Sequence, residues 1–262
     1  MDAPPLLFTV QFRRKMAELS QQQRRDWLAS LAHRLRTAPV ASAVSQELRE
    51  VARGCRLPLV DAIERQLGPF DPRHLEALLD VPRERFVRAE DIERSADDAP
   101  LPLDDEGFAT ISAPHAYLLS FRLLELALGD ELVELGAGSG YGAALAAFIV
   151  GPKGRVITFE IDAVLASAAG RALAGEPTVT IVHGDAMASA GAWRTAKKVV
   201  VTFAIESVPR SWLDALPEGG RLVAPVGAKE HEQQLVLVQR QAGRIVESVH
   251  GTVRYVQNRS EK

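Results

Sequence analysis

A glycine-rich turn at residues 136–140 constrains the fold of this 262-residue chain more than any other segment. The apolar run Leu132–Leu135 leads directly into this turn, and an Ala-rich stretch at 143–150 follows it. Glycine allows a backbone to approach a ligand closely and to adopt conformations that a Cβ atom forbids. The segment therefore predicts a strand, a ligand-binding turn and a helix, in that order.

Two kinds of cofactor compete for such a turn. The dinucleotide pattern G-x-G-x-x-G fails from Gly136, because Tyr141 stands at the third glycine position, and it passes only weakly from Gly138. The acid before the glycines also suits the cationic S-adenosylmethionine (SAM) better than a pyrophosphate. The turn resembles the SAM loop of class I methyltransferases, so we favour SAM over NAD. The expected cofactor contacts here are Glu134, Gly136, Gly138, Ser139 and Gly140.

Two glycines of this region are expected to differ in what they tolerate. Gly138 is the middle glycine of the turn, where a valine would occupy the space of the ligand or require a forbidden φ. Gly142 falls inside the predicted helix, where alanine is favoured by about 0.8–1 kcal/mol. We therefore expect Gly138→Val to abolish cofactor binding and Gly142→Ala to be tolerated.

Helix-like and strand-like segments alternate from residue 115 onward. This alternation predicts an α/β fold with a doubly wound, mostly parallel sheet. A turn at Ala242-Gly243 predicts that the last two strands form an antiparallel hairpin at one edge. The expected strands are 130–135, 155–160, 178–182, 198–203, 220–225, 233–241 and 244–256, and the expected helices are 115–128, 140–150, 162–174 and 209–216.

Acids follow the next two strands, at the sheet edge where ligands of such folds bind. Glu160 ends the second strand and is expected to accept hydrogen bonds from ribose hydroxyls, with Ile161 beside it. Asp162 fits the role of N-cap of the following helix better than Glu160 does. Asp185 and Ala186 follow the third strand, where the aspartate can accept from an adenine amino group.

Residues 1–56 form a predicted helical extension before a cofactor-binding domain at 57–262. Pro39, Gly54 and Pro58 are expected to divide the helical region into short helices. The apolar faces predict packing on the catalytic domain or on a second subunit. The arginines predict a solvated face, or as a sharper hypothesis one wall of an acceptor cleft. Removal of residues 1–56 should then leave cofactor affinity intact and reduce transfer to the acceptor.

Composition excludes several classes of protein. A net charge of −3 is unlike the strongly basic surface of a nucleic-acid-binding domain. No stretch approaches the ~20 apolar residues of a membrane span. A single cysteine, Cys55, excludes an internal disulfide and fits a reducing compartment. We expect a cytoplasmic protein without a metal site, and leave its oligomeric state open.

Several separated motifs, in order, resemble the protein L-isoaspartate O-methyltransferase family. The segment Ala109–His115 resembles the Thr-Ile-Ser motif that this family carries ahead of its SAM loop. The resemblance extends over residues 57–257. The further matching segments are Asp71–Val87 with its Val-Pro-Arg signature, Pro100–Pro102, Gly219–Gly227, Gln233-x-Leu235 and Val253–Val256.

The resemblance implies a class I methyltransferase fold and transfer of a methyl group from SAM to an isoaspartyl or aspartyl carboxylate of a peptide or protein. S-adenosyl-L-homocysteine is then the product. By the same resemblance Ser112 orients the acceptor carboxylate, with Thr110 and His115 flanking it. Gln233 is expected near the cofactor or the acceptor.

Departures from the family pattern leave alternatives open. The acceptor loop at 104–109 is two residues longer than usual, and Lys197-Lys198 replaces the usual Tyr-Asp. A specialised peptide-tailoring enzyme that methylates one aspartate on the way to a succinimide is therefore an alternative to general repair. A tRNA adenine N-methyltransferase, suggested by Gly151–Val156, and a non-catalytic SAM-fold binding protein are the others.

Overall fold

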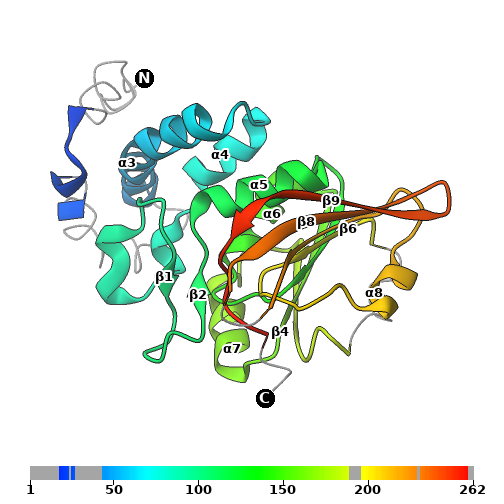
Figure 1. Cartoon of the computed structure of the whole chain (residues 1–262). Coiled ribbons are helices and arrows are strands. Elements are labelled where there is room, and N and C mark those ends of the chain that lie inside the picture. Colours follow the sequence, from blue (N-terminus) through cyan, green and yellow to red (C-terminus); the bar gives the residue numbers. More distant parts are fainter. Residues whose placement is uncertain (1–17, 24, 27–42, 189–195, 229–230, 259–262) are drawn as a thin grey trace.

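The computed structural model describes residues 18–23, 25–26, 43–188, 196–228 and 231–258 (Figure 1). Its centre is a seven-stranded sheet with the order β5-β4-β3-β6-β7-β8-β9. The first five strands in this order are parallel, and β8 and β9 are antiparallel to their neighbours. The predicted α/β fold and its edge hairpin are therefore confirmed.

Most elements lie close to their predicted positions. The strands of the large sheet are β3 (Glu131–Leu135), β4 (Arg155–Glu160), β5 (Val179–His183), β6 (Lys198–Val201), β7 (Arg221–Val226), β8 (Gln233–Gln241) and β9 (Arg244–Val253). The α-helices are α3 (Ala43–Leu67), α4 (Pro72–Asp80), α5 (Pro114–Leu124), α6 (Tyr141–Val150), α7 (Ala163–Ala172) and α8 (Arg210–Ala215). The structure also describes two short 3-10 helices, η2 (Arg83–Arg85) and η3 (Ala89–Arg94), and a small sheet of β1 (Leu101–Pro102) and β2 (Thr110–Ile111).

The central strands are buried on both faces of the sheet. Leu132 of β3 packs in the core on the side of α5 and α6, whereas Val133 packs on the side of α8. Successive side chains of a strand point to opposite faces, so one apolar run supplies both cores. Helices α3 and α4 add a second layer over α5 and α6 (Figure 1).

Helix α3 is longer than the sequence pattern predicts. Gly54 and Pro58 lie inside this one helix, so the predicted breaks at these residues are wrong. A proline inside a helix removes one hydrogen bond, but the side chains that follow it, Val60 and Ile63, are buried in the core. Tertiary packing therefore overrides the local signal. The helix runs across the expected domain boundary at 56–57 without interruption.

A buried ion pair fixes α3 to the rest of the domain. Arg56 Nη1 lies 2.6 Å from Glu84 Oε1 and 2.8 Å from Glu84 Oε2, and the two side chains are 2% and 0% exposed. The Arg56 guanidinium also donates to the carbonyl of Leu79. Arg56 belongs to residues 1–56, whose removal is expected to leave cofactor affinity intact and to reduce transfer to the acceptor. Its loss would leave a buried, unpaired carboxylate at Glu84, so we expect removal of residues 1–56 to destabilise the catalytic domain as well.

The described part of the N-terminal segment contacts the loop after η3. Gln21 Nε2 donates to Asp97 Oδ1 at 2.9 Å, and Arg25 Nη2 lies 2.5 Å from Asp97 Oδ2. Arg25 is therefore paired and lies outside the large pocket described below. The other arginines of residues 13–36 lie outside the described residues. Within the described chain, no helix has the length and apolar character needed to cross a membrane.

We predict that Arg56→Met lowers the free energy of unfolding by about 3–5 kcal/mol, because it leaves Glu84 charged and buried. Arg53→Met is the matched control, since Arg53 lies one turn earlier and its ion pair with Asp80 is partly exposed. The control should cost less than about 1 kcal/mol. Urea denaturation of the three proteins measures both values. Equal losses of unfolding free energy in the two variants would contradict the large contribution that we assign to the buried ion pair.

Candidate active site

A pocket of about 710 Å³ opens at the carboxyl ends of β3, β4, β5 and β6. These are the ends at which ligands bind in folds of this kind. The glycine-rich turn, the end of β4 and the turn after β5 form one side of the pocket, and residues 108–112 form another. Among the predicted site residues, those that line it are Thr110, Ser112, Gly136, Gly138, Ser139, Glu160, Ile161, Asp185 and Ala186.

The glycine-rich turn is held open by positive φ angles. Gly136 has φ 103° and Gly138 has φ 53°, both in the region that favours glycine. A Cβ atom on Gly136 would overlap Thr202 Oγ1, which donates to the carbonyl of Gly136 at 2.5 Å. The carbonyl of Phe159 accepts from Gly136 N and from Ala137 N, at 2.9 and 2.8 Å. The turn is thus fixed to β4 and presents bare backbone to the pocket.

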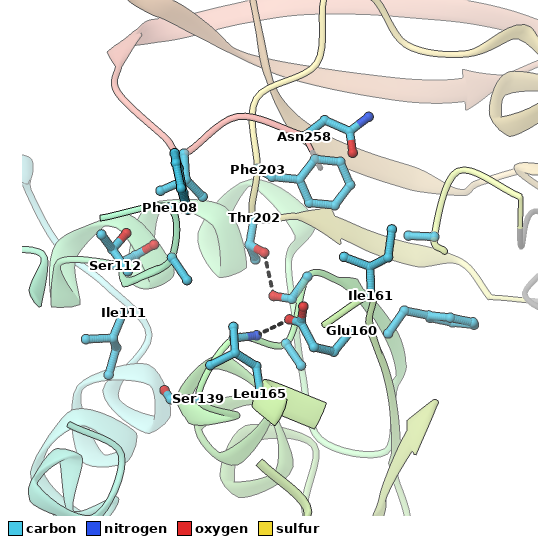
Figure 2. Close-up of a pocket in the computed structure, with 18 of the residues that line it drawn as sticks. Phe108, Ile111, Ser112, Ser139, Glu160, Ile161, Leu165, Thr202, Phe203 and Asn258 are labelled. Atoms are coloured by element: carbon cyan, nitrogen blue, oxygen red, sulfur yellow. Dashed lines mark hydrogen bonds between the residues drawn. The ribbon is translucent and has the colours of Figure 1, made fainter. Parts of the chain in front are cut away.

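Glu160 joins the glycine-rich turn to the end of β4. Its Oε2 accepts from Gly138 N at 2.7 Å (Figure 2), and its Oε1 accepts from Asp162 N at 3.0 Å. The side chain is 6% exposed and lines the pocket. A carboxylate has about four lone-pair positions, so these two backbone bonds are compatible with further acceptance from ribose hydroxyls. The site therefore fits the adenosyl part of SAM.

The acids near Glu160 have different functions in the fold. Asp162 Oδ1 accepts from Val164 N and Leu165 N, which confirms the predicted N-cap of α7. Asp185 lines the pocket at the turn after β5, and its Oδ1 accepts from Met187 N at 2.8 Å. That bond orders the turn, while the place of Asp185 in the pocket lining suits contact with an adenine ring.

Ser112 lies across the pocket from Glu160 (Figure 2). It directly follows β2, and its backbone N–H donates to the phenol oxygen of Tyr117 at 3.2 Å. Burial raises the pKa of Tyr117 above its usual value, so the phenol stays neutral. Within the described residues, the Ser112 hydroxyl has no hydrogen-bond partner. The backbone is thus fixed while the side chain can turn toward a ligand.

Several lining residues were not predicted from the sequence. Tyr117 comes from α5, and Phe108, 53% exposed, stands at the rim. Thr202 and Phe203 follow β6, and residues 256–258, near the C-terminus, also line the pocket. Ala204 N donates to the carbonyl of Val256 at 2.8 Å, which brings this end to the site. Long-range contacts place Thr202, Phe203 and residues 256–258 at the pocket. By contrast, the spacing of Tyr117 from Ser112 at a helix start was a usable sequence signal.

Four predicted site residues do not line the pocket. Gly140 caps α6, with φ 86°. Gln233 is 1% exposed; its Nε2 donates to the carbonyl of His231, and its Oε1 accepts from Tyr255 N. His115 Nδ1 lies 2.9 Å from Asp98 Oδ1, at the start of α5. The fourth residue is Glu134, whose side chain packs beneath the turn.

Glu134 is buried between β3, β4 and α6. Thr158 Oγ1 donates to Glu134 Oε2 at 2.6 Å, and the side chain is 1% exposed. A Cβ atom on Gly142 would overlap Glu134 Oε1 and would lie 2.9 Å from Tyr117 Cε1. The expectation that Gly142→Ala is tolerated is therefore wrong. Close packing between strand and helix outweighs the helix propensity of alanine at this position.

Comparisons with known proteins agree with this geometry. The model of the family "Protein-L-isoaspartate(D-aspartate) O-methyltransferase (PCMT)" matches residues 59–262. A protein-L-isoaspartate O-methyltransferase of Methanothermobacter thermautotrophicus is 37% identical over 162 residues, covering 61% of this chain and 74% of the relative. One of Methanopyrus kandleri is 38% identical over 212 residues, covering 79% and 92%. A Plasmodium falciparum crystal structure in complex with S-adenosyl-L-homocysteine shares the fold, with TM-score 0.66, 22% identity and coverage of 76% and 95%.

We predict that Glu134 makes stability fall as pH rises. Burial raises its pKa from 4.5 to about 8, and the charge of Glu160 adds to the increase, against the hydrogen bond from Thr158. Between about pH 5 and 8 the folded protein keeps a proton that the unfolded chain releases. The free energy of unfolding then decreases by up to about 1.4 kcal/mol per pH unit from this group.

Glu134→Gln should remove this slope, as measured by urea denaturation at several pH values from 5 to 8. Glu131→Gln is the control, because Glu131 lies on the same strand with its side chain 34% exposed. The control should keep the slope of the unchanged protein. An unaltered slope in Glu134→Gln would mean that Glu134 is ionised in the folded state.

Proposed function

The chain belongs to the protein-L-isoaspartate(D-aspartate) O-methyltransferase family, and we propose which residues of its pocket carry out the carboxyl methylation of this family. It is a SAM-dependent enzyme that methylates the carboxylate of isoaspartyl residues. The observation that carries the assignment of roles is the position of Ser112 across one pocket from Glu160 (Figure 2).

Glu160 and the glycine-rich turn form the cofactor side in this proposal. Glu160 accepts hydrogen bonds from the ribose hydroxyls, Asp185 and Ile161 contact the adenine, and the backbone at 136–139 lies against the remainder of SAM. When bound, SAM supplies a methyl group on a cationic sulfonium. The positive φ angles of Gly136 and Gly138 and the fixed carboxylate of Glu160 support this assignment, because they require no rearrangement of the turn.

Ser112 and its neighbours form the acceptor side. A carboxylate is already ionised and nucleophilic at neutral pH, so the reaction requires no general base. Alignment and exclusion of water are then the contributions that remain for the protein. We assign orientation of the acceptor carboxylate to the Ser112 hydroxyl and a flanking position to Thr110. The apolar side chains of Phe108 and Ile111 in the lining support the exclusion of water.

The acceptor is a peptide or protein segment, and two versions of the activity remain to be separated. General repair accepts any exposed isoaspartyl residue, whereas a specialised enzyme accepts one dedicated peptide. The hairpin between β1 and β2, longer than in the family pattern, and the contacts of Gln21 and Arg25 with Asp97 favour some specialisation. We keep general isoaspartyl methylation as the leading proposal and place the enzyme in the cytoplasm, in line with the single cysteine of the sequence, Cys55.

We predict that Glu160→Gln weakens SAM binding by roughly 10- to 100-fold, because a charge-assisted hydrogen bond contributes about 1.5–3 kcal/mol. Asp162→Ala is the matched control, since it removes the N-cap of α7 without changing the pocket lining. The control should lose about 1 kcal/mol of stability and keep SAM affinity. Titration calorimetry and thermal unfolding separate the two effects. A Glu160 variant that loses stability only would make this acid a structural one.

We predict that the unchanged enzyme transfers labelled methyl groups from SAM to a generic isoaspartyl peptide, and that Ser112→Ala slows this transfer by about 10- to 100-fold. SAM affinity should stay within about twofold, because Ser112 lies on the acceptor side. Ser248→Ala is the control: its Oγ lies 2.8 Å from His250 Nε2 on the exposed β9, away from the pocket lining. Absence of turnover by the unchanged enzyme, with SAM bound, would favour the dedicated-peptide version.

A further inference from the structure

The side chain of Arg83 is buried completely and binds backbone rather than acids. Arg83 Nη1 donates to the carbonyls of Ser95 and Asp97, at 3.3 and 2.9 Å. Nη2 donates to the carbonyls of Ala99 and Ser112, at 2.7 and 3.1 Å. The side chain is 0% exposed, and no ion pair to a carboxylate forms among the described residues. One guanidinium thus connects the loop at 95–99 with the segment that carries Ser112.

A buried cation of this kind depends on the hydrogen bonds that it makes. Here Nη1 and Nη2 make all four, while Nε has no partner among the described residues. Desolvation of a guanidinium is expensive, and it lowers the pKa of Arg83. The four carbonyls and the ring of Tyr141, 6.0 Å away, offset this cost. The planar fork of an arginine matches two pairs of acceptors at fixed angles, whereas a lysine presents one compact charge. A lysine at position 83 therefore cannot bind the four carbonyls in the same arrangement.

The residue Ser112 is held from both sides of its backbone. Its carbonyl accepts from Arg83, and its N–H donates to the phenol oxygen of Tyr117. Neither bond uses the Ser112 hydroxyl, which lies on the pocket side (Figure 2). The two bonds fix the position and direction of the Cα–Cβ bond, and hence where the hydroxyl can reach. Displacement of a substrate-orienting group by about 1 Å can slow a reaction by roughly 100-fold.

We propose that Arg83 is the positioning residue of the acceptor side, which sets the place of Ser112 by holding its carbonyl together with those of the loop at 95–99. The proposal deepens the function proposed above and rests on it for its kinetic consequence. One part of the proposal, that Arg83 keeps the segment at 109–113 ordered, can be tested without knowledge of the acceptor. Arg83 touches neither acceptor nor cofactor in this arrangement, since it does not line the pocket.

The test compares Arg83→Lys with Arg56→Lys. Both arginines are almost fully buried and bind backbone carbonyls, but Arg56 contacts Leu79 and Glu84 and makes no bond to Ser112. Both variants should lose stability. Arg83→Lys alone should lower kcat for the isoaspartyl peptide by about 10- to 100-fold, with SAM affinity within about twofold of the unchanged enzyme. Equal kcat losses in the two variants, or none in Arg83→Lys, would overturn the proposal.

Hydrogen exchange gives a readout that needs no turnover. The amides of residues 109–113 should exchange about tenfold faster in Arg83→Lys than in the unchanged enzyme and in Arg56→Lys. Unaltered exchange in this segment would overturn the proposal, even if the peptide proves to be the wrong acceptor.

Tyr117→Phe supplies a second variant in case Arg83→Lys does not fold, because it removes the other bond to Ser112. It should show the same faster exchange at 109–113, and normal exchange there would count against positioning of Ser112 by these bonds.

Discussion

The register between β3 and β4 is the constraint on which the site depends. Leu135 pairs with Phe159, so the glycine-rich turn leaves β3 beside the last residues of β4. The carbonyl of Phe159 and the carboxylate of Glu160 then accept three successive N–H groups of the turn. A shift of one residue would turn Glu160 to the other face of the sheet. The cofactor side is therefore a direct product of strand pairing, and requires no separate folding event.

The acceptor side is built on a different principle. No strand of the large sheet carries Ser112; it follows a two-residue strand in a small hairpin and precedes α5. Short, irregular segments lack a ladder of hydrogen bonds of their own, so buried side chains must supply partners for their carbonyls. Arg83 does this for the loop at 95–99 and for Ser112, and Arg56 does it for the end of α4 at Leu79. Outside the large sheet, two buried guanidiniums thus supply the hydrogen bonds that these backbone carbonyls need.

The features of the fold that could be predicted from the sequence are those that local residue patterns and the ends of strands determine. The alternation of elements, the edge hairpin and the N-cap at Asp162 follow from periodicity and capping chemistry, and all three are confirmed. The continuity of α3 through Gly54 and Pro58 was not predictable in this way, because distant packing decides it. The same is true of residues 256–258 at the pocket, which reach it only through the folded chain.

Glu134 shows why an acid in a motif is not enough to define a ligand. Its carboxyl group fills the space that the missing side chain of Gly142 leaves on α6. The two positions are eight residues apart in the chain but share one volume, so neither can change alone without a void or a collision. Over evolutionary time they should vary together: a small residue at 134 accompanies any side chain larger than hydrogen at 142. A cofactor loop transplanted between relatives would accordingly have to carry the first turn of its helix with it.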